Sequence, residues 1–266
     1  MQHWDLMDVP PGQTRRVAIG PLCLWIRRME HEWRLAWAGN ESPGARRDDA
    51  AAGDEPPPHA EWSRWAAPAG ETRLQLIPVL PDRGVVVRPT GSFRIPPGVK
   101  VRLFVPLPVW VRVATGSATV LTEVPTTHLS NTWFGEPDAG ELSWAVKADP
   151  RFTFEDHAPA GHEALCRVDI HHKGGEQIEL NRLFVRVEHL RVYRAGAHLW
   201  TNGIKAVYEG GEKVGSVDYL KSAPSQAAGA VKLSDEREPV GGALVRARAG
   251  LLRSLEVDKR WWGGTG

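Results

Sequence analysis

The sequence predicts an all-β protein made of two packed β-sandwich units, Ig-like or jelly-roll-like, with little helix. Apolar and polar residues alternate through most of the chain, whereas the 3.6-residue period of amphipathic helices is scarce. The prolines fall between the alternating runs, where their missing N–H marks edges and turns. The tetrapeptide Arg-Leu-Phe-Val at residues 102–105 recurs at residues 182–185, and Gly116 and Gly196 lie at equivalent positions after the two copies. This recurrence indicates either an internal duplication or a chance similarity between two strands.

The first two segments are a hairpin and an insert. Residues 1–38 are expected to form an N-terminal hairpin on the first sandwich, because alternating runs at 22–27 and 33–37 flank a polar turn. Residues 39–70 are rich in Ala, Pro, Asp and Gly, which predicts a flexible insert. Only Trp62 and Trp65 interrupt this composition, and they either pin its end to the fold or form one helical turn.

The remaining chain divides into the two sandwich units. Residues 71–150 form the first unit, and residues 151–266 form the second unit with a C-terminal extension. Strands of the first unit are expected at 74–79, 84–88, 92–95, 99–105, 109–114 and 118–124, followed by a hairpin of 129–134 and 141–146. Strands of the second unit are expected at 165–171, 177–180, 183–187, 190–193, 198–200, 204–208 and 216–220. Residues 238–255 carry a weak helical stripe or a last strand pair.

Charge and hydropathy bound the function. The 33 basic and 32 acidic residues leave a net charge of +1, so no overall field attracts nucleic acid or anionic lipid. The longest uncharged apolar run, at 103–111, is far shorter than the roughly 20 residues that span a bilayer as a helix. Cys23 and Cys166 lie in apolar alternating runs, which predicts buried free thiols in a reducing compartment. We therefore expect a cytoplasmic protein without nucleic-acid binding or direct membrane insertion.

The most informative segment is residues 127–144, where polar, aromatic and turn-forming residues separate two strand-like runs. Its structural interpretation is a tight hairpin, with Gly135 and Gly140 permitting the turn and both tryptophans in the core. Its functional interpretation is a candidate binding loop, formed by His128, Ser130, Asn131, Trp133, Glu136, Asp138, Glu141 and Trp144.

Two alternatives use this loop differently. A ligand-binding module would hold a carbohydrate-like or other flat polar ligand on Trp133 and Trp144 and the 136–141 loop. A hydrolase would need Glu136, Asp138 and Glu141 to converge with His128, although carboxylates on one loop rarely face each other across a cleft. Standard nucleophile, phosphate-loop, dinucleotide and zinc-protease motifs are absent from the sequence. We therefore predict no catalytic residues, no metal and no cofactor.

Several ordered motifs resemble a known family. They are residues 22–37 with their Glu-Trp pair, the segment Pro-Val-Leu-Pro at 78–81 with the valine run after it, the 129–142 block, and Leu-Trp-Thr at 199–201. Together they resemble the DUF432 proteins of archaea and bacteria over most of the chain, although the 39–70 insert is longer than expected. The resemblance implies no catalytic residues to transfer. It also implies an association with small-conductance mechanosensitive channels, and so an accessory or regulatory role.

The sequence therefore favours a non-catalytic interaction or regulatory module with a protein partner. Tryptophan is unusually frequent, with 12 residues against 6 Phe and 3 Tyr. Those outside the expected strands are the candidates for an exposed partner-binding patch. These are Trp62, Trp65, Trp261 and Trp262.

Overall fold

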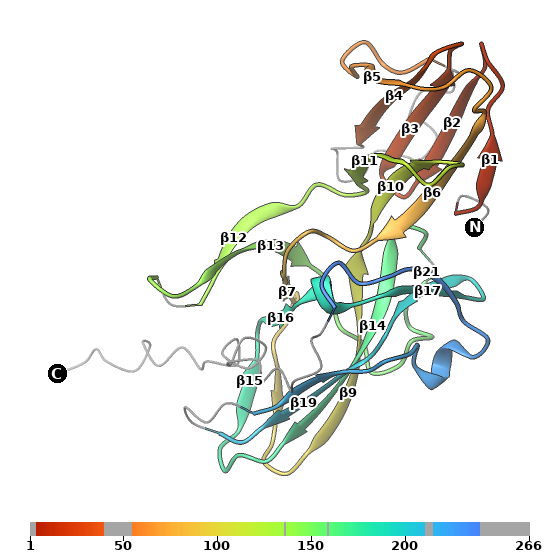
Figure 1. Cartoon of the computed structure of the whole chain (residues 1–266). Helices are drawn as coiled ribbons and strands as arrows, with labels where there is room; N and C mark the ends of the chain where they lie inside the picture. Colours follow the sequence, from red (N-terminus) through yellow and green to blue (C-terminus); the bar gives the residue numbers. More distant parts are fainter. Residues whose placement is uncertain (1–3, 40–54, 136, 159, 211–214, 240–266) are drawn as a thin grey trace.

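The computed structural model describes residues 4–39, 55–135, 137–158, 160–210 and 215–239 (Figure 1). It confirms the all-β class. Apart from strands, the regular structure of these residues consists of two short 3-10 turns, η1 (Val187–His189) and η2 (Ser225–Ala227). Two four-stranded sheets make up the upper part of Figure 1, and a curved seven-stranded sheet makes up the lower part.

The N-terminal sheet confirms the predicted hairpin. Its order is β2 (Thr14–Ile19), β3 (Leu22–Arg28), β4 (Glu32–Gly39) and β5 (Ser63–Ala66), all antiparallel. The end of the predicted insert is therefore a strand, and not a helical turn. Trp65 lies opposite Trp33 and packs against the main core, while the Arg27 guanidinium lies 4.8 Å from the centre of the Trp62 ring. Residues 40–54 of the insert lie outside the described residues.

A buried arginine joins this sheet to the strand that follows the insert. Arg28 is 0% exposed, yet its guanidinium donates only to backbone carbonyls among the contacts described. Its Nε donates to the oxygen of Glu71 at 2.6 Å, and Nη2 donates to that of Pro68 at 2.8 Å. Nη1 reaches the carbonyls of Met29 and Glu32, the latter at 3.0 Å. Five N–H donors in a planar fork allow one side chain to fix several backbone segments together.

The second sheet continues the upper part of the molecule. Its order is β1 (Leu6–Asp8), β6 (Arg73–Val79), β10 (Trp110–Thr115) and β11 (Val120–Pro125), again antiparallel. Strand β21 (Val231–Ser234) of the lower sheet reaches this region, where the Ser234 hydroxyl donates to the carbonyl of Pro78 at 2.6 Å. Close to it, Arg237 donates to the carbonyl of Leu80 at 2.8 Å. The last described residues thus connect the two parts of the fold.

The seven-stranded sheet is centred on β14 (Glu163–His172). Its order is β20 (Val217–Tyr219), β19 (Ile204–Tyr208), β14, β18 (His198–Thr201), β17 (Val192–Ala195) and β21. Strand β9 (Lys100–Pro108) pairs with β14 along nine positions. A small two-stranded sheet of β8 (Phe93–Ile95) and β15 (Ile178–Leu180) lies in the same part of the molecule.

A third four-stranded sheet carries the candidate loop. Its order is β12 (Ser130–Phe134), β13 (Glu141–Lys147), β7 (Val85–Arg88) and β16 (Leu183–Val185). Strands β13 and β7 are parallel, whereas the other two pairs are antiparallel. Because β7 and β13 are parallel and lie far apart in sequence, their pairing depends on the whole intervening chain.

Strand pairing does not follow the expected division at residue 150. Strands from before and after this position share three sheets, through the pairs β9–β14, β7–β16 and β8–β15. The two copies of Arg-Leu-Phe-Val also lie in strands with different neighbours, since β9 pairs with β14 and β16 pairs with β7. The separation into two sandwiches and the duplication therefore remain predictions.

One main apolar core runs through both parts of the molecule, with three smaller clusters beside it. Both cysteines are buried free thiols, as predicted. Burial raises the pKa of Cys166 to about 12, since desolvation disfavours the thiolate. This thiol is therefore unreactive at neutral pH.

Candidate functional site

The candidate loop is the β12–β13 hairpin, which projects from the body as an arm (Figure 1). Its strands match the predicted hairpin at 129–134 and 141–146 closely. Gly135 begins the turn with φ of 107°, and a Cβ at this position would lie 2.8 Å from the Cα of Gly140. The turn therefore needs glycine at residue 135, both for its backbone conformation and for the close approach.

One face of the hairpin carries an exposed apolar pair. Trp133 lies directly opposite Leu142, and Asn131 lies opposite Trp144, so all four side chains share this face. Trp133 is 51% exposed and Leu142 is 50% exposed. The prediction that Trp133 fills the core is wrong, because its part of the arm extends beyond the strands that cover the base.

Trp144, at the base of the same face, is half-buried and packs against the main core. Its indole Nε1 donates to Asp82 at 2.8 Å, and the guanidinium of Arg83 lies 4.3 Å from its ring centroid. The ring of Trp110 meets it edge to face at 6.2 Å. These contacts occupy much of the Trp144 surface, so the two tryptophans do not form a pair of equally open platforms.

The opposite face anchors the arm. Phe134 stacks on Phe184 of β16, with ring centroids 4.1 Å apart and an interplanar angle of 16°, and Val86 completes this buried cluster. The guanidinium of Arg186 lies 5.2 Å from the Phe184 ring and donates to Glu141 of β13 at 3.1 Å. The arm is thus held by one aromatic stack and one ion pair.

The candidate polar residues are not brought together. Asp138 is exposed in the turn, whereas Glu141 is half-buried and paired with Arg186. His128 and Ser130 are exposed at the opposite end of the arm, and Asn131 lies 3.5 Å from Arg83. Glu136 lies outside the described residues. Among the residues that are described, the hairpin therefore lacks the facing carboxylates and nearby histidine that the hydrolase hypothesis requires.

A metal-binding role also lacks geometric support. Within the described ranges, no group of three or more His, Cys, Asp and Glu side chains could hold a metal ion. Asp169 instead accepts from Arg102 at 2.7 Å and from Arg167 at 3.0 Å. Burial raises the pKa of Asp169, but these two guanidinium groups outweigh it and the pKa is lowered.

Glu188 is the unusual carboxylate of the region. Glu188 lies in η1, two residues after Arg186, and its Oε1 is 3.4 Å from the Arg186 Nη1. Its other carboxylate oxygen, Oε2, is buried and has no hydrogen-bond partner among the described residues. Burial raises the pKa of Glu188 because desolvation outweighs the attraction of Arg186. Burial, with a smaller contribution from the Glu188 charge, raises the pKa of Tyr219.

We expect Glu188→Gln to stabilise the protein at neutral pH by on the order of 1 kcal/mol, because desolvation penalises the buried negative charge and the amide carries none. A carboxyl whose folded pKa is raised contributes stability below its unfolded value of 4.5, and this is lost as pH rises through the folded pKa. The advantage of the variant should therefore disappear below pH 4.5. Thermal unfolding across pH measures this effect, with the exposed Glu155→Gln as control. A lower Tm for Glu188→Gln at pH 7 would contradict it.

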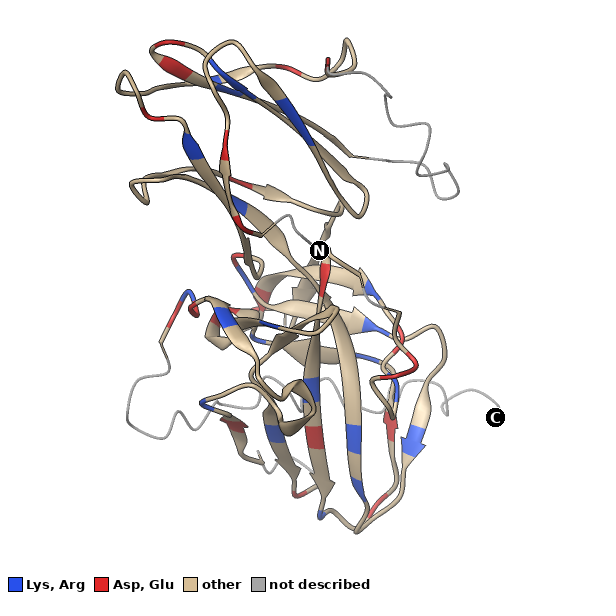
Figure 2. Ribbon diagram, turned by 90° about the vertical axis from the view of Figure 1, so that its right-hand side faces the viewer, with Lys and Arg blue, Asp and Glu red and all other residues tan. Residues whose placement is uncertain are grey.

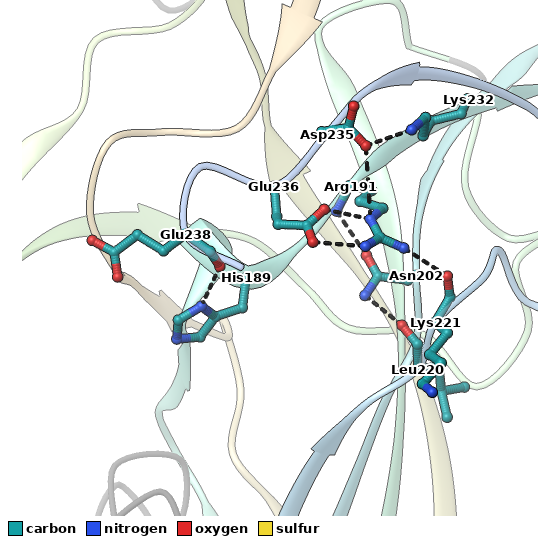
Figure 3. A network of polar contacts seen from close by, with 9 residues as sticks. All are labelled: His189, Arg191, Asn202, Leu220, Lys221, Lys232, Asp235, Glu236 and Glu238. Carbon is teal, nitrogen blue, oxygen red and sulfur yellow. Dashed lines mark hydrogen bonds and ion pairs between the residues drawn. The ribbon is translucent and has the colours of Figure 1, made fainter. Parts of the chain in front are cut away.

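A polar network fixes the segment that follows β21 (Figure 3). Arg191 donates to Glu236 at 2.6 Å and to the carbonyl of Lys221 at 2.9 Å. The side-chain oxygen of Asn202 accepts from the Arg191 backbone N–H at 2.7 Å, and its Nδ2 donates to Leu220. The hydrogen bond from Arg191 lowers the pKa of Glu236, so this pair stabilises the fold above pH 4.5 and loses that contribution as pH falls.

Sequence reasoning missed the residues that position the hairpin. Phe184 and Arg186 were expected only as residues of the strand at 183–187. The partner of Arg186 is Glu141, 45 positions away. No local pattern indicates this pair, although the apolar parity of Phe184 and Phe134 is consistent with their burial.

Charged residues of both signs are mixed along the strands of the whole molecule (Figure 2), which agrees with the near-neutral net charge. In the described ranges, no helix has the length and apolar character needed to cross a bilayer.

Comparison with known proteins supports one assignment. The family model described as "Protein of unknown function (DUF432)" matches residues 3–252, which is nearly the whole chain. No curated protein and no solved structure matches the chain significantly. The resemblance seen in the ordered motifs of the sequence is thereby confirmed, and the chain belongs to the DUF432 family.

Proposed function

We propose that this protein is a non-catalytic interaction module of the cytoplasm, and that the β12–β13 hairpin is its contact surface. The observation that carries the proposal is the pair of Trp133 and Leu142, directly opposed and half exposed on one face of a projecting arm. Interfaces are enriched in tryptophan, and a large apolar pair held on a rigid strand is a typical energetic centre of binding.

The anchoring of the arm supports this role. The Phe134–Phe184 stack and the Arg186–Glu141 pair fix the hairpin from its opposite face. Trp133 and Leu142 are therefore presented by an ordered element, and binding costs less conformational entropy than it would from a mobile loop. The ligand-binding alternative would have to rely chiefly on Trp133, because Arg83 lies over the Trp144 ring.

The class of the partner protein follows from the family resemblance alone. That resemblance implies a partner channel of the small-conductance mechanosensitive type, for which this chain would be an accessory or regulatory subunit. A cytoplasmic domain of such a channel is therefore the protein that we expect on the hairpin.

Affinity capture with the full chain tests the proposal. The immobilised protein is incubated with a detergent-solubilised lysate of its source organism, and the bound proteins are quantified by mass spectrometry. We expect the wild type to recover a channel subunit, and Trp133→Ser or Leu142→Ser to reduce the recovery by about tenfold or more, as for the loss of an interface hot spot.

Phe152→Ser is the matched control, because Phe152 is a 61% exposed aromatic residue on another part of the surface. This variant should recover the partner as the wild type does. Equal recovery by all variants would move the interface away from the hairpin, and recovery of no partner by the wild type would overturn the proposed function. Circular dichroism of each variant verifies its fold.

A further inference from the structure

The outer edge of the arm is an open strand. β12 pairs only with β13 in the described residues, so one row of its N–H and C=O groups is not used within the sheet. Its sequence, Ser-Asn-Thr-Trp-Phe, contains no charged residue and no proline. The ladder between β12 and β13 has no register shift. Edge strands without such features are templates for pairing with another chain.

The other sheet-edge strands of the described chain differ from β12. Each is short and buried or is interrupted by charge, proline or an irregular register, which are the usual means of blocking edge pairing. Strand β16 has three residues, all buried. The blocking residues of the others include Asp8 in β1, Arg15 in β2, Arg64 in β5, Arg94 in β8, Lys100 in β9, Pro125 in β11, Glu179 in β15, Asp218 in β20 and Lys232 in β21.

Charges flank β12 unequally along its length. Arg83 approaches Asn131 at 3.5 Å on one face, and Arg88 donates to the Thr132 hydroxyl at 3.1 Å on the other. The turn beyond the second half of the strand carries the exposed Asp138. The first half of β12 is therefore flanked by two guanidinium groups, and its far end is followed by an acid.

We propose that the occupant of this edge is β12 of a second copy of the chain, paired antiparallel about a two-fold axis at Thr132. This register pairs all five residues, with Ser130 opposite Phe134 of the second copy and Asn131 opposite its Trp133. It joins two four-stranded sheets into one continuous sheet across the dimer.

The chemistry of the strand fits a copy of itself. A two-fold axis places each residue near its own equivalent, and β12 itself has no charged residue that would face a like charge. The guanidinium at the axis belongs to Arg88 of β7, and its exposure to solvent screens the repulsion between the two copies. Antiparallel pairing also brings Arg83 of one copy toward the Asp138 end of the other, where opposite charges attract. Trp133 of each copy then lies beside Arg83 of the other, a favourable pairing of aromatic ring and cation.

This inference rests on the proposed function because both use the β12–β13 hairpin as a contact surface. Here the occupant of the open β12 edge is a second copy of the chain. Its first test is the mass of the purified full chain by size-exclusion chromatography with light scattering. We expect a dimer of twice the chain mass of 29.4 kDa, dissociating on dilution. A monomer at every concentration would overturn it.

Cysteine cross-linking tests the register. Directly opposed residues of antiparallel strands have Cα atoms about 4.5–5.5 Å apart, which is within the range that a disulfide spans. Thr132→Cys should therefore form a covalent dimer under mild oxidation. In Ser130→Cys the two thiols would be more than about 13 Å apart, because four residue steps of about 3.3 Å separate them along the strand. The two native cysteines are buried and give little background.

We expect the covalent dimer of Thr132→Cys to exceed that of Ser130→Cys by about tenfold, given the steep distance limit of the disulfide. Equal cross-linking of both variants, or none in Thr132→Cys, would overturn the proposed pairing. Neither result depends on lysate proteins, so failure here is distinguishable from failure of the capture experiment. A channel captured by a protein that is monomeric would retain the proposed function and remove this inference.

Discussion

Arg28→Met is expected to lower the free energy of unfolding by about 3–5 kcal/mol, the range found when one member of a buried polar set is removed. The Arg28 side chain is fully buried, and its guanidinium donates to carbonyls on both sides of the insert. Methionine fills a similar volume but leaves the oxygens of Glu71 and Pro68 without this donor. The loss should be measured by urea unfolding at neutral pH.

Arg64→Met is the matched control for this prediction. Arg64 pairs with Glu32 on the same sheet, but its side chain is 66% exposed, so we expect a loss below about 1 kcal/mol. Arg28→Lys gives a second comparison, because it keeps the charge but loses the planar fork, and it should also be destabilising. Similar stability of Arg28→Met and Arg64→Met would show that Arg28 does not hold the insert to the sheet.

Phe184→Ala is expected to cost about 3–5 kcal/mol, the usual loss for a large aromatic side chain removed from a core. The Phe184 ring is fully buried, stacks on Phe134 and also fills the space beside Gly84, where a Cβ would lie 2.4 Å from it. Removing it should leave a cavity beneath the arm and loosen the β12–β13 hairpin in particular. Hydrogen exchange of the hairpin amides, together with urea unfolding, measures both effects.

Phe152→Ala again serves as the control, since a 61% exposed ring loses little apolar burial and should change stability by less than about 0.5 kcal/mol. If Phe184→Ala lowered overall stability and left exchange in the hairpin unchanged, the stack would belong to the general core and would not be the anchor of the arm. If it changed neither quantity, the packing described around Phe184 would be wrong.

Local patterns were sufficient for the hairpins. The alternation in residues 22–37 predicted the β3–β4 pair, and the glycines and polar residues at 135–140 predicted the β12–β13 turn. Both depend on neighbours in sequence, where side-chain parity and turn chemistry act over a few residues. The position of the hairpin was predicted correctly in this way, although the exposure of Trp133 was not.

The long-range strand pairings could not be predicted from the sequence, and the reason is physical. The parallel contact of β7 with β13 and the antiparallel contact of β9 with β14 join strands that many residues separate. Their apolar patterns would suit several neighbours, and the choice depends on which closed arrangement buries them all. The expected boundary at residue 150 followed strand density along the chain, which contains no information on such pairings.

The sequence by itself determined the all-β class, the hairpins, the burial of both cysteines and membership of the DUF432 family. These follow from short periodicities and ordered motifs, which each residue carries irrespective of its distant contacts. Only the tertiary structure decided that Trp133 and Leu142 are exposed, that Trp144 lies beneath Arg83, and that Arg186 holds the arm through Glu141. Exposure and ion pairing depend on what the rest of the chain places against a side chain, and alternation specifies only the face of the strand on which it lies.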